Sequence, residues 1–243
     1  MDAITIFWES NTVQDLWEII SQSSGIMHLN EYHEYYMNLL DLQRIASPSF
    51  VPTVYDILRS YEPTSTTTTH NYNVGGVDFE MYDTGGRQLL EAENFPQCLE
   101  QISDKVDAII FVASLAAYDE TCSNGTNCMA EALEKFKYIV TNPPFVDMPI
   151  VLILNKHDIF AQKISHSDII SHGFTDYSGP PMDSDYGANY FINKFEEHVL
   201  IGGEGAFACH VHCGTNSNSI LHFCDSLTRE ILDQLLQQDI SRV

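Results

Sequence analysis

Three short polar segments of the sequence each follow an apolar stretch that is typical of a buried strand. They are residues 83–86 (DTGG), 155–158 (NKHD) and 213–215 (CGT). Open α/β sheets bind ligands outside the carboxyl ends of their strands, which is where all three segments are predicted to lie. Taken alone, residues 155–158 are more simply a polar turn between a strand and a helix. Together, in this order and each at a strand end, the segments indicate a ligand site.

The first segment suits a phosphate group that is bound together with a metal ion. A carboxylate at Asp83 can hold magnesium through water. Gly85 and Gly86 have no side chain, so the backbone there can approach a phosphate closely. The sequence therefore predicts a phosphate and magnesium contact at the end of this strand.

The other two segments suit a guanine base. A carboxylate at Asp158 can accept both N–H groups of the guanine edge, while the stem of Lys156 lies over the ring. The small residues at 213–215 leave room for backbone N–H groups to meet a carbonyl oxygen of the base. The predicted nucleotide-binding residues are Asp83, Gly85, Gly86, Asn155, Lys156, Asp158, Cys213, Gly214 and Thr215.

Strands and helices are predicted to alternate from about residue 70 onward. Apolar strands are expected over residues 77–82, 108–113, 150–154 and 206–212, and helices over residues 129–140, 186–199 and 219–237. Continuous apolar strands separated by helices are typical of an α/β fold with a mainly parallel sheet and helices on both faces.

Residues 1–60 have a different pattern, because their apolar side chains recur at helical spacing. We expect short packed helices here, broken at Ser47-Pro48 and again at residues 51–53. Thr53 is a suitable cap for a helix that runs through Leu58. The threonine-rich segment that follows, residues 63–69, is polar and disfavours helix, so we interpret it as a linker or mobile loop.

The charge balance limits the classes of partner. The chain has 34 acidic and 11 basic residues and a formal net charge of -23. Such a surface repels the phosphates of nucleic acids and anionic lipids, so we do not expect either as a non-specific partner. No apolar run is long enough to span a bilayer, so membrane attachment would come through a partner.

The sequence has six cysteines and shows no secretory signal, so we expect their thiols to be reduced. Cys122 and Cys128 flank a short polar loop, and a redox pair is conceivable there, but we expect two free thiols. Residues 124–126 (NGT) match a glycosylation sequon, and we interpret them as an ordinary turn.

Five stretches of the sequence resemble the α subunits of heterotrimeric G proteins. They read YYMNLLDLQRIASPSFVPTVYDILR, DTGGR, DAIIFVASLAAYDE, LILNKHDIF and HVHCGTNSNSILHFCDSLTREIL. The resemblance implies a Ras-like, P-loop GTPase-type domain over residues 61–243 and a partial all-helical domain over residues 1–60. It also implies a guanine nucleotide-binding signal transducer in G protein-coupled receptor signalling, with GTP or GDP and Mg²⁺ as cofactors. The implied partners are a G protein βγ dimer and a receptor, in the cytoplasm or at the inner face of the plasma membrane through those partners.

The sequence departs from this family where catalysis takes place. The family's first strand and phosphate-binding loop would precede residue 1, and the 13 glycines contain no Gly-x4-Gly spacing. Thr64 and Asp83 match metal-binding positions, but Tyr61 and Arg87 occupy those of the family's arginine and glutamine. Such an arginine is worth about 10³ to 10⁵ in rate. Arg87 has no acceptor to orient water, and it is equally well interpreted as an exposed loop residue. We therefore expect no catalytic residue, weak nucleotide binding, and weak or absent GTP hydrolysis.

Other interpretations stay open. The chain could be a non-enzymatic pseudo-GTPase interaction module, or an incomplete product of a longer coding region. Acidic and apolar residues at 89–95 replace a basic helix that contacts βγ in the family, so a weaker βγ contact is expected. Without the first strand, the sheet would expose apolar faces and open edges, which predicts marginal folding, rearrangement or oligomerisation.

A zinc site is a further alternative. His210 and His212 share one face of a predicted strand beside Cys213, and imidazole and thiolate are zinc ligands. The strand period and the family resemblance favour a structural role for these residues.

Overall fold

The computed structural model describes residues 2–22, 39–60, 67–74, 76–84, 99–100, 102–122, 124–202, 206–214 and 226–233. The elements in chain order are α1 (Asp2–Trp8), α2 (Asn11–Gln22), α4 (Leu39–Ile45), α5 (Val54–Arg59), β1 (Thr68–Val74), β2 (Val77–Asp83), β3 (Ile109–Ser114), the 3₁₀ helix η2 (Leu115–Asp119), α8 (Cys128–Thr141), β4 (Ile150–Asn155), α9 (His157–Ile164), the 3₁₀ helix η3 (Ile169–His172), α10 (Ser184–Gly202) and β5 (Phe207–Val211). Residues 226–233 are also helical. The remainder of the helix expected over residues 219–237 lies outside the described residues.

Three strands form a parallel sheet in the order β3-β4-β5. The middle strand, β4, reads IVLILN, and its first five residues are buried. Branched apolar side chains without polar interruption suit a strand that is covered on both faces. The strands expected over residues 108–113, 150–154 and 206–212 are confirmed, and their ends differ from the observed ends by one residue at most.

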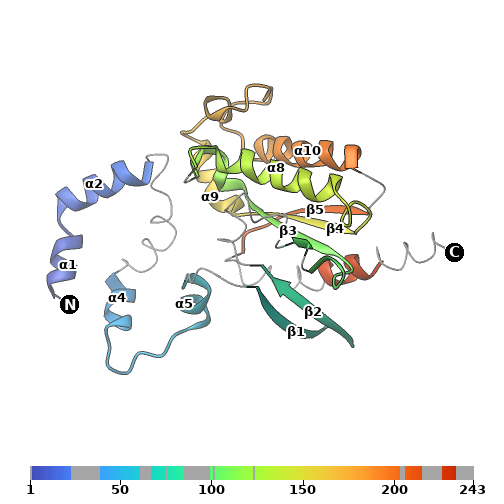
Figure 1. The fold of residues 1–243 in the computed structure, drawn as a ribbon. Coiled ribbons are helices and arrows are strands. Elements are labelled where there is room, and N and C mark those ends of the chain that lie inside the picture. The colour runs from blue at the N-terminus through green and yellow to red at the C-terminus, as the bar shows by residue number, and fades with distance from the viewer. Residues whose placement is uncertain are drawn as a thin grey trace.

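Helices cover both faces of this sheet. On one face α8 and α10 lie side by side (Figure 1), and the rings of Phe136 and Phe195 meet edge to face with centroids 5.1 Å apart. On the other face, His210 of β5 has its ring Nε2 2.5 Å from Oε2 of Glu230, in the helical residues 226–233. The predicted α/β architecture, with a mainly parallel sheet and helices on both faces, is confirmed.

Strands β1 and β2 form an antiparallel hairpin, a separate sheet among the described residues. Pairing runs from Thr68 opposite Asp83 to Val74 opposite Val77. The expectation of a linker over residues 63–69 is wrong at its last two residues, which begin β1. β-branched threonine suits an extended strand, and the partner β2 supplies the pairing that makes the strand stable. Residues 63–66 lie outside the described residues.

Within residues 2–22 and 39–60, which the structure describes, the helical pattern expected for residues 1–60 is confirmed. In Figure 1, α1, α2 and α4 lie apart from the parallel sheet. Trp8 of α1 and Trp17 of α2 pack edge to face with ring centroids 5.4 Å apart. Several apolar side chains of this part face solvent, and those of Ile6 and Phe7 are 70% and 61% exposed. These short helices therefore bury only part of their apolar surface.

Helix α5 begins where the sequence predicts. Thr53 Oγ1 accepts a hydrogen bond from the Asp56 N–H at 3.2 Å, and the Asp56 carboxylate accepts one from the Thr53 N–H at 2.7 Å. This reciprocal capping box satisfies two backbone donors that the first turn would leave without partners. The guanidinium of Arg44 in α4 donates to both oxygens of Asp56, at 2.8 and 2.7 Å, and so links α4 to α5.

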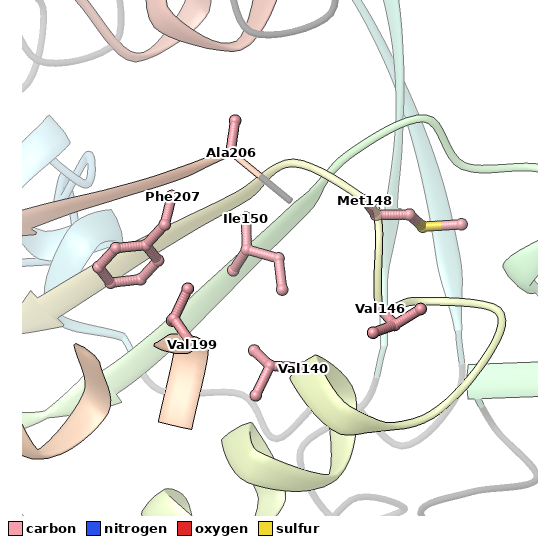
Figure 2. A pocket seen from close by; sticks show the side chains of 7 residues that line it. All are labelled: Val140, Val146, Met148, Ile150, Val199, Ala206 and Phe207. Carbon is pink, nitrogen blue, oxygen red and sulfur yellow. The ribbon is translucent and has the colours of Figure 1, made fainter. Parts of the chain in front are cut away.

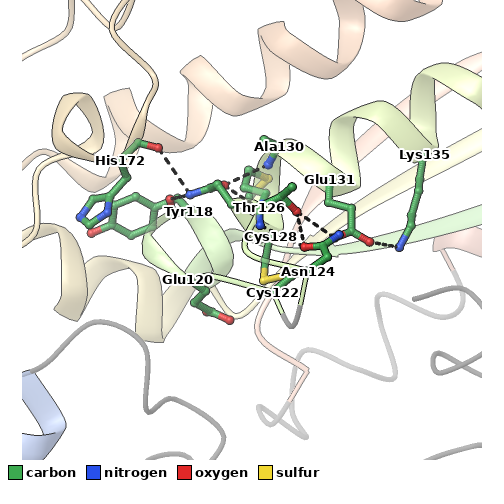
Figure 3. Close-up of a disulfide and its surroundings, with 12 residues drawn as sticks. Tyr118, Glu120, Cys122, Asn124, Thr126, Cys128, Ala130, Glu131, Lys135 and His172 are labelled. Atoms are coloured by element: carbon green, nitrogen blue, oxygen red, sulfur yellow. Dashed lines mark hydrogen bonds and ion pairs between the residues drawn. A yellow bond between two sulfur atoms is a disulfide. The ribbon is translucent and has the colours of Figure 1, made fainter. Parts of the chain in front are cut away.

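Cys122 and Cys128 form a disulfide, so the expectation of two free thiols is wrong (Figure 3). The reason lies in the turn between them. Gly125 has φ +83°, and Thr121 pairs with Asn127 as an antiparallel bridge, so the chain reverses on itself. The two cysteine Cα atoms are 5.2 Å apart, within the range that a disulfide requires. Composition alone does not reveal this turn.

Candidate functional site

The structure brings two of the three predicted segments into direct contact. Strands β4 and β5 are parallel neighbours, so their carboxyl ends lie at the same edge of the sheet. At that edge the side-chain oxygen Oδ1 of Asn155 accepts a hydrogen bond from the backbone N–H of Gly214 at 2.8 Å. A Cβ atom at Gly214 would lie 3.1 Å from Nδ2 and 3.2 Å from Oδ1 of Asn155. Residue 214 is therefore held against Asn155 at a distance that suits glycine.

Backbone pairing extends this contact beyond the end of β5. The His212 N–H donates to the Leu154 carbonyl oxygen at 2.8 Å, and the His157 N–H donates to the His212 carbonyl oxygen at 3.3 Å. The loop after β5 is therefore joined to the start of α9 by main-chain bonds. This pairing positions Cys213, which is half-buried, beside the turn that follows β4.

The turn from β4 into α9 presents the two residues predicted to bind the base. Lys156 has φ 63° and ψ 38°, the left-handed conformation that non-glycine residues seldom adopt. Strained backbone of this kind is concentrated at functional sites. Asp158 is exposed and lies in the first turn of α9, where the helix dipole favours a carboxylate. The turn thus leaves Asp158 exposed to solvent, three residues after Asn155.

The remaining predicted residues are placed differently. Asp83 is exposed and ends β2, so it belongs to the hairpin rather than to the parallel sheet. Six predicted positions lie outside the described residues: Tyr61, Thr64, Gly85, Gly86, Arg87 and Thr215. The described structure thus contains the base side of the predicted site and, of the phosphate and metal side, Asp83.

A buried charged cluster, which the sequence does not predict, lies near the carboxyl edge of the parallel sheet. The ammonium group of Lys163 in α9 donates to the carbonyl oxygen of Ala116 at 2.7 Å and to the carboxylates of Asp119 and Glu120. Its side chain is 14% exposed, and that of Asp119 is 3% exposed. The cluster fixes α9 to the segment that follows β3. Lys163 is more than 40 positions from its acidic partners. The only feature of the sequence that indicates the cluster is the acidic pair after Tyr118.

Burial controls the ionisation of one member of this cluster. Burial raises the pKa of Glu120 to about 7, although the positive charges of Lys163 and Lys156 lower it. Tyr118 lies beside the cluster, and its hydroxyl donates to the Ser167 carbonyl oxygen at 2.6 Å. Burial also raises the pKa of Tyr118 above its ordinary range. The low-polarity surroundings at the end of β3 thus favour neutral forms of both groups.

The opposite end of the sheet has a small hollow that does not suit a ligand (Figure 2). It is lined only by apolar side chains, including Val140, Met148, Ile150 and Phe207, and its volume is about 10 Å³. This is about the space of one water molecule, which is too small for a nucleotide or another organic ligand. The hollow is therefore a packing gap at the amino ends of β4 and β5.

The described residues contain no group of three or more histidine, cysteine or acidic side chains that could hold a metal ion. His210 instead pairs with Glu230. Within the described part of the chain, no helix is long and apolar enough to cross a membrane.

Comparison with known proteins identifies the family. The family model "G-protein alpha subunit" matches residues 1–231. The chain belongs to the G-protein alpha subunit family. It is 32% identical over 238 residues to the guanine nucleotide-binding protein alpha-7 subunit of Caenorhabditis briggsae, an alignment that covers 95% of this chain and 64% of that protein. It is 29% identical over 239 residues to the alpha-1 subunit of Caenorhabditis elegans, covering 97% of this chain and 64% of that protein. The chain thus spans less than two thirds of the length of these G-protein alpha subunits.

The groups at this edge of the parallel sheet are compatible in chemical type with the base of a guanine nucleotide. The Gly214 N–H already donates to Asn155, so it is engaged within the protein. The absence of a side chain at residue 214 lets the backbone approach Asn155 closely. Asp158 is exposed, and a carboxylate can accept hydrogen bonds from N–H groups of the kind that guanine presents. Asp83 is exposed, and its carboxylate oxygens are of the type that Mg²⁺ prefers.

Proposed function

We propose that this chain binds guanine nucleotides mainly through the base and acts as a G-protein alpha-type signal transducer with weak or absent GTP hydrolysis. The observation that carries the proposal is the hydrogen bond from the Gly214 N–H to the Asn155 side chain at the carboxyl edge of β4 and β5. It joins two predicted base-binding segments that are far apart in the sequence. The left-handed Lys156 and the exposed Asp158 next to it support the same assignment.

We propose weak affinity for residues 1–243 taken by themselves, because of the groups that they contain. Tight nucleotide binding in proteins of this kind relies on backbone N–H groups and a lysine that cradle the phosphates. The sequence has no Gly-x4-Gly segment for that task. Contacts to the base, with Asp83 and Thr64 as proposed ligands of a hydrated magnesium ion, support a binding free energy of roughly -4 to -6 kcal/mol.

Calorimetric titration with GMP, GDP and GTP in the presence of magnesium tests this proposal. If the base supplies most of the affinity, the three nucleotides bind with dissociation constants within a few-fold of one another, and adenine nucleotides bind more weakly. Asp158→Asn replaces an acceptor by an amide and should weaken GDP binding about tenfold or more, since a hydrogen bond to a charged group is worth about 1.5–3 kcal/mol.

Asp185→Asn is the matched control, because Asp185 is also exposed in the first turn of a helix, α10. Both substitutions remove the same favourable interaction with a helix dipole, but only Asp158 belongs to the proposed site. Equal affinity for guanine and adenine nucleotides, or equal effects of the two substitutions on GDP binding, would contradict the proposal.

Hydrolysis is proposed to be weak because Tyr61 and Arg87 stand where the family has its catalytic arginine and glutamine. A tyrosine cannot supply the positive charge that stabilises the transition state, and an arginine cannot accept a hydrogen bond from the attacking water. A single-turnover assay with saturating GTP measures this directly. A rate equal to that of a full-length family member would overturn this part of the proposal.

We also propose the division into a partial helical domain, residues 1–60, and a GTPase-type domain, residues 61–243. A βγ dimer and a G protein-coupled receptor are the proposed partners, at the cytoplasmic side of the plasma membrane. Co-precipitation of the chain with a purified βγ dimer, with and without GDP, tests the first partner. Residues 89–95, where a βγ contact is expected to be weakened, lie outside the described residues.

A non-enzymatic interaction module is the second candidate function. The observation in its favour is the exposure of apolar side chains on the amino-terminal helices, such as Ile6, Phe7 and Val54 at 70%, 61% and 67%. Exposed apolar groups that cluster on a surface are typical of protein interfaces. This candidate is favoured if the chain binds a protein partner equally well with and without guanine nucleotide.

A further inference from the structure

We propose that Cys122 and Cys128 form a reversible redox site, at which a dithiol opens the disulfide and loosens the amino-terminal end of α8. The proposal does not depend on nucleotide binding. It rests on how the two cysteines are held, on what the ring between them contains, and on the position of Cys128 at the start of a long helix.

The backbone holds the two cysteines together independently of the bond between their sulfur atoms. The Cys122 N–H donates to the Thr126 carbonyl oxygen at 2.8 Å, and the Cys128 N–H donates to the Glu120 carbonyl oxygen at 2.9 Å. The Gly125 N–H closes the turn by donating to the Cys122 carbonyl oxygen at 2.9 Å. Because these bonds do not involve sulfur, the two thiols stay near each other after reduction. Oxidation can then re-form the same pair.

Side chains also support the loop from both ends (Figure 3). Asn124 Oδ1 accepts hydrogen bonds from the Thr126 N–H at 3.0 Å and from its hydroxyl at 2.6 Å. The Asn124 amide donates to the carboxylate of Glu131 at 3.2 Å, and Glu131 in turn pairs with Lys135 at 2.5 Å. The loop is thus anchored to the first turns of α8 by hydrogen bonds that reduction leaves in place.

The disulfide ring contains the residue that caps α8. Asn127 Oδ1 accepts from the N–H groups of Met129 and Ala130, both at 3.0 Å. Its amide donates to the Tyr118 carbonyl oxygen at 2.6 Å and to the His172 carbonyl oxygen at 3.4 Å. A single side chain therefore joins η2, η3 and the start of α8. Opening the ring removes the covalent restraint on this residue.

The chemistry at the two sulfur atoms is not equivalent. Both cysteines are half-buried, so an external thiolate can reach them. Cys128 is the first residue of the 14-residue helix α8, where the helix dipole stabilises a thiolate. A thiol with a lower pKa is the better leaving group in thiol–disulfide exchange. The position of the helix thus favours attack on the sulfur of Cys122.

Exchange at this site proceeds in two balanced steps. A thiolate of the dithiol attacks Sγ of Cys122, the Cys122–Cys128 bond breaks, and the electron pair leaves on Sγ of Cys128. The second thiol of the reagent loses its proton to solvent. The resulting thiolate attacks the reagent's first sulfur atom, the one that is bonded to Sγ of Cys122 in the mixed disulfide. This releases Cys122 as a thiolate and leaves the dithiol oxidised to a cyclic disulfide. Protonation of the two cysteine thiolates completes the reduction.

The first experiment equilibrates the full chain with mixtures of reduced and oxidised dithiothreitol, followed by alkylation and peptide mass spectrometry. The expected result is a fully reversible change between a Cys122–Cys128 cross-link and two alkylated thiols. In a separate reaction with 2-mercaptoethanol, the mixed disulfide is expected on Cys122. The proposal is overturned if the pair stays reduced in excess oxidised reagent, if it stays cross-linked in excess reduced reagent, or if either cysteine pairs with another.

The second experiment measures the consequence for α8 by hydrogen exchange. In the reduced chain the amides of Met129 and Ala130 should exchange about fivefold faster, comparable to partial loss of a helix cap. A Cys122→Ser, Cys128→Ser double variant should exchange like the reduced chain under both conditions. Cys209→Ser, which alters a half-buried thiol in β5, is the control and should retain the full redox response. Equal exchange in the oxidised and reduced wild-type chains would show that the bond does not restrain α8, and would refute the conformational part.

Discussion

The parallel-sheet region and the amino-terminal helices of this chain differ in how they use apolar residues. Around β3, β4 and β5, the side chains of Phe136, Phe191 and Phe195 are completely buried. In α1 and α5, large apolar side chains such as Phe7 and Val54 are mostly exposed. The difference shows that helical periodicity alone does not create a core. A sheet with helices against it surrounds a side chain, whereas two short helices cover it on one side only.

Polar links differ between the two regions in the same way. Lys163 and Asp119 form a pair that is almost fully buried between α9 and η2. Arg44 and Asp56 join α4 to α5, but the Arg44 side chain remains 34% exposed. A buried pair strongly penalises the removal of one partner, while solvent screens an exposed one. The parallel-sheet region should therefore respond more strongly to mutation and to pH.

The largest expected effect comes from emptying the core of the parallel-sheet region. Phe136→Ala removes a ring that packs edge to face against Phe111, Phe195 and Phe207. We expect a loss of about 3–5 kcal/mol in the free energy of unfolding, measured by chemical denaturation. Phe7→Ala is the control in the other region and should cost no more than about 0.5 kcal/mol. Similar losses for both substitutions would remove the distinction between the regions.

The second expected effect is a pH dependence that arises from Glu120. Its pKa is about 7 in the folded chain, above the ordinary value of 4.5, because of burial. The folded chain therefore retains a proton that the unfolded chain releases. The stabilising contribution is fully present below about pH 4.5 and is lost as the pH rises through 7. We expect a decrease of about 1–3 kcal/mol in the free energy of unfolding across this window.

Glu120→Gln is the variant that isolates this effect, because it keeps the shape of the side chain and cannot ionise. Urea denaturation of the wild type and of the variant at several pH values gives two curves, and their difference reports on Glu120 alone. A difference that stays constant between pH 4.5 and 7 would contradict the assignment.

The smallest expected effect concerns the amino-terminal helices. Thr53→Ala removes the hydroxyl that caps α5 and should lower the free energy of unfolding of this part by about 1 kcal/mol. Thr53→Ser keeps a hydroxyl and should retain most of that stability. Far-UV circular dichroism during denaturation measures both. If alanine and serine prove equivalent, the capping box does not contribute to the stability of α5.

The sequence was sufficient to predict elements whose residues carry their own signal. The uninterrupted apolar run of β4 predicts a strand covered on both faces, and Thr53 predicts the start of α5. It was insufficient for β1, which is polar and rich in threonine and whose conformation depends on pairing with β2. The positions of residues 155–158 and 213–214 at strand ends could be predicted, because each segment follows an apolar strand. The bond between Asn155 and Gly214 could not, because it joins residues 59 positions apart.

The sequence by itself determined the three strands of the parallel sheet, the strong negative charge, and the family to which the chain belongs. Periodicity, composition and short motifs are local properties of a chain, so they survive without a fold. Only the tertiary structure decided that Cys122 pairs with Cys128 and that Gly214 donates to Asn155. It also decided that Lys163 pairs with Asp119 at the end of η2 and with Glu120, which follows. Each of these contacts depends on a turn or a sheet edge that brings separated residues together, and that proximity is set by packing rather than by residue type.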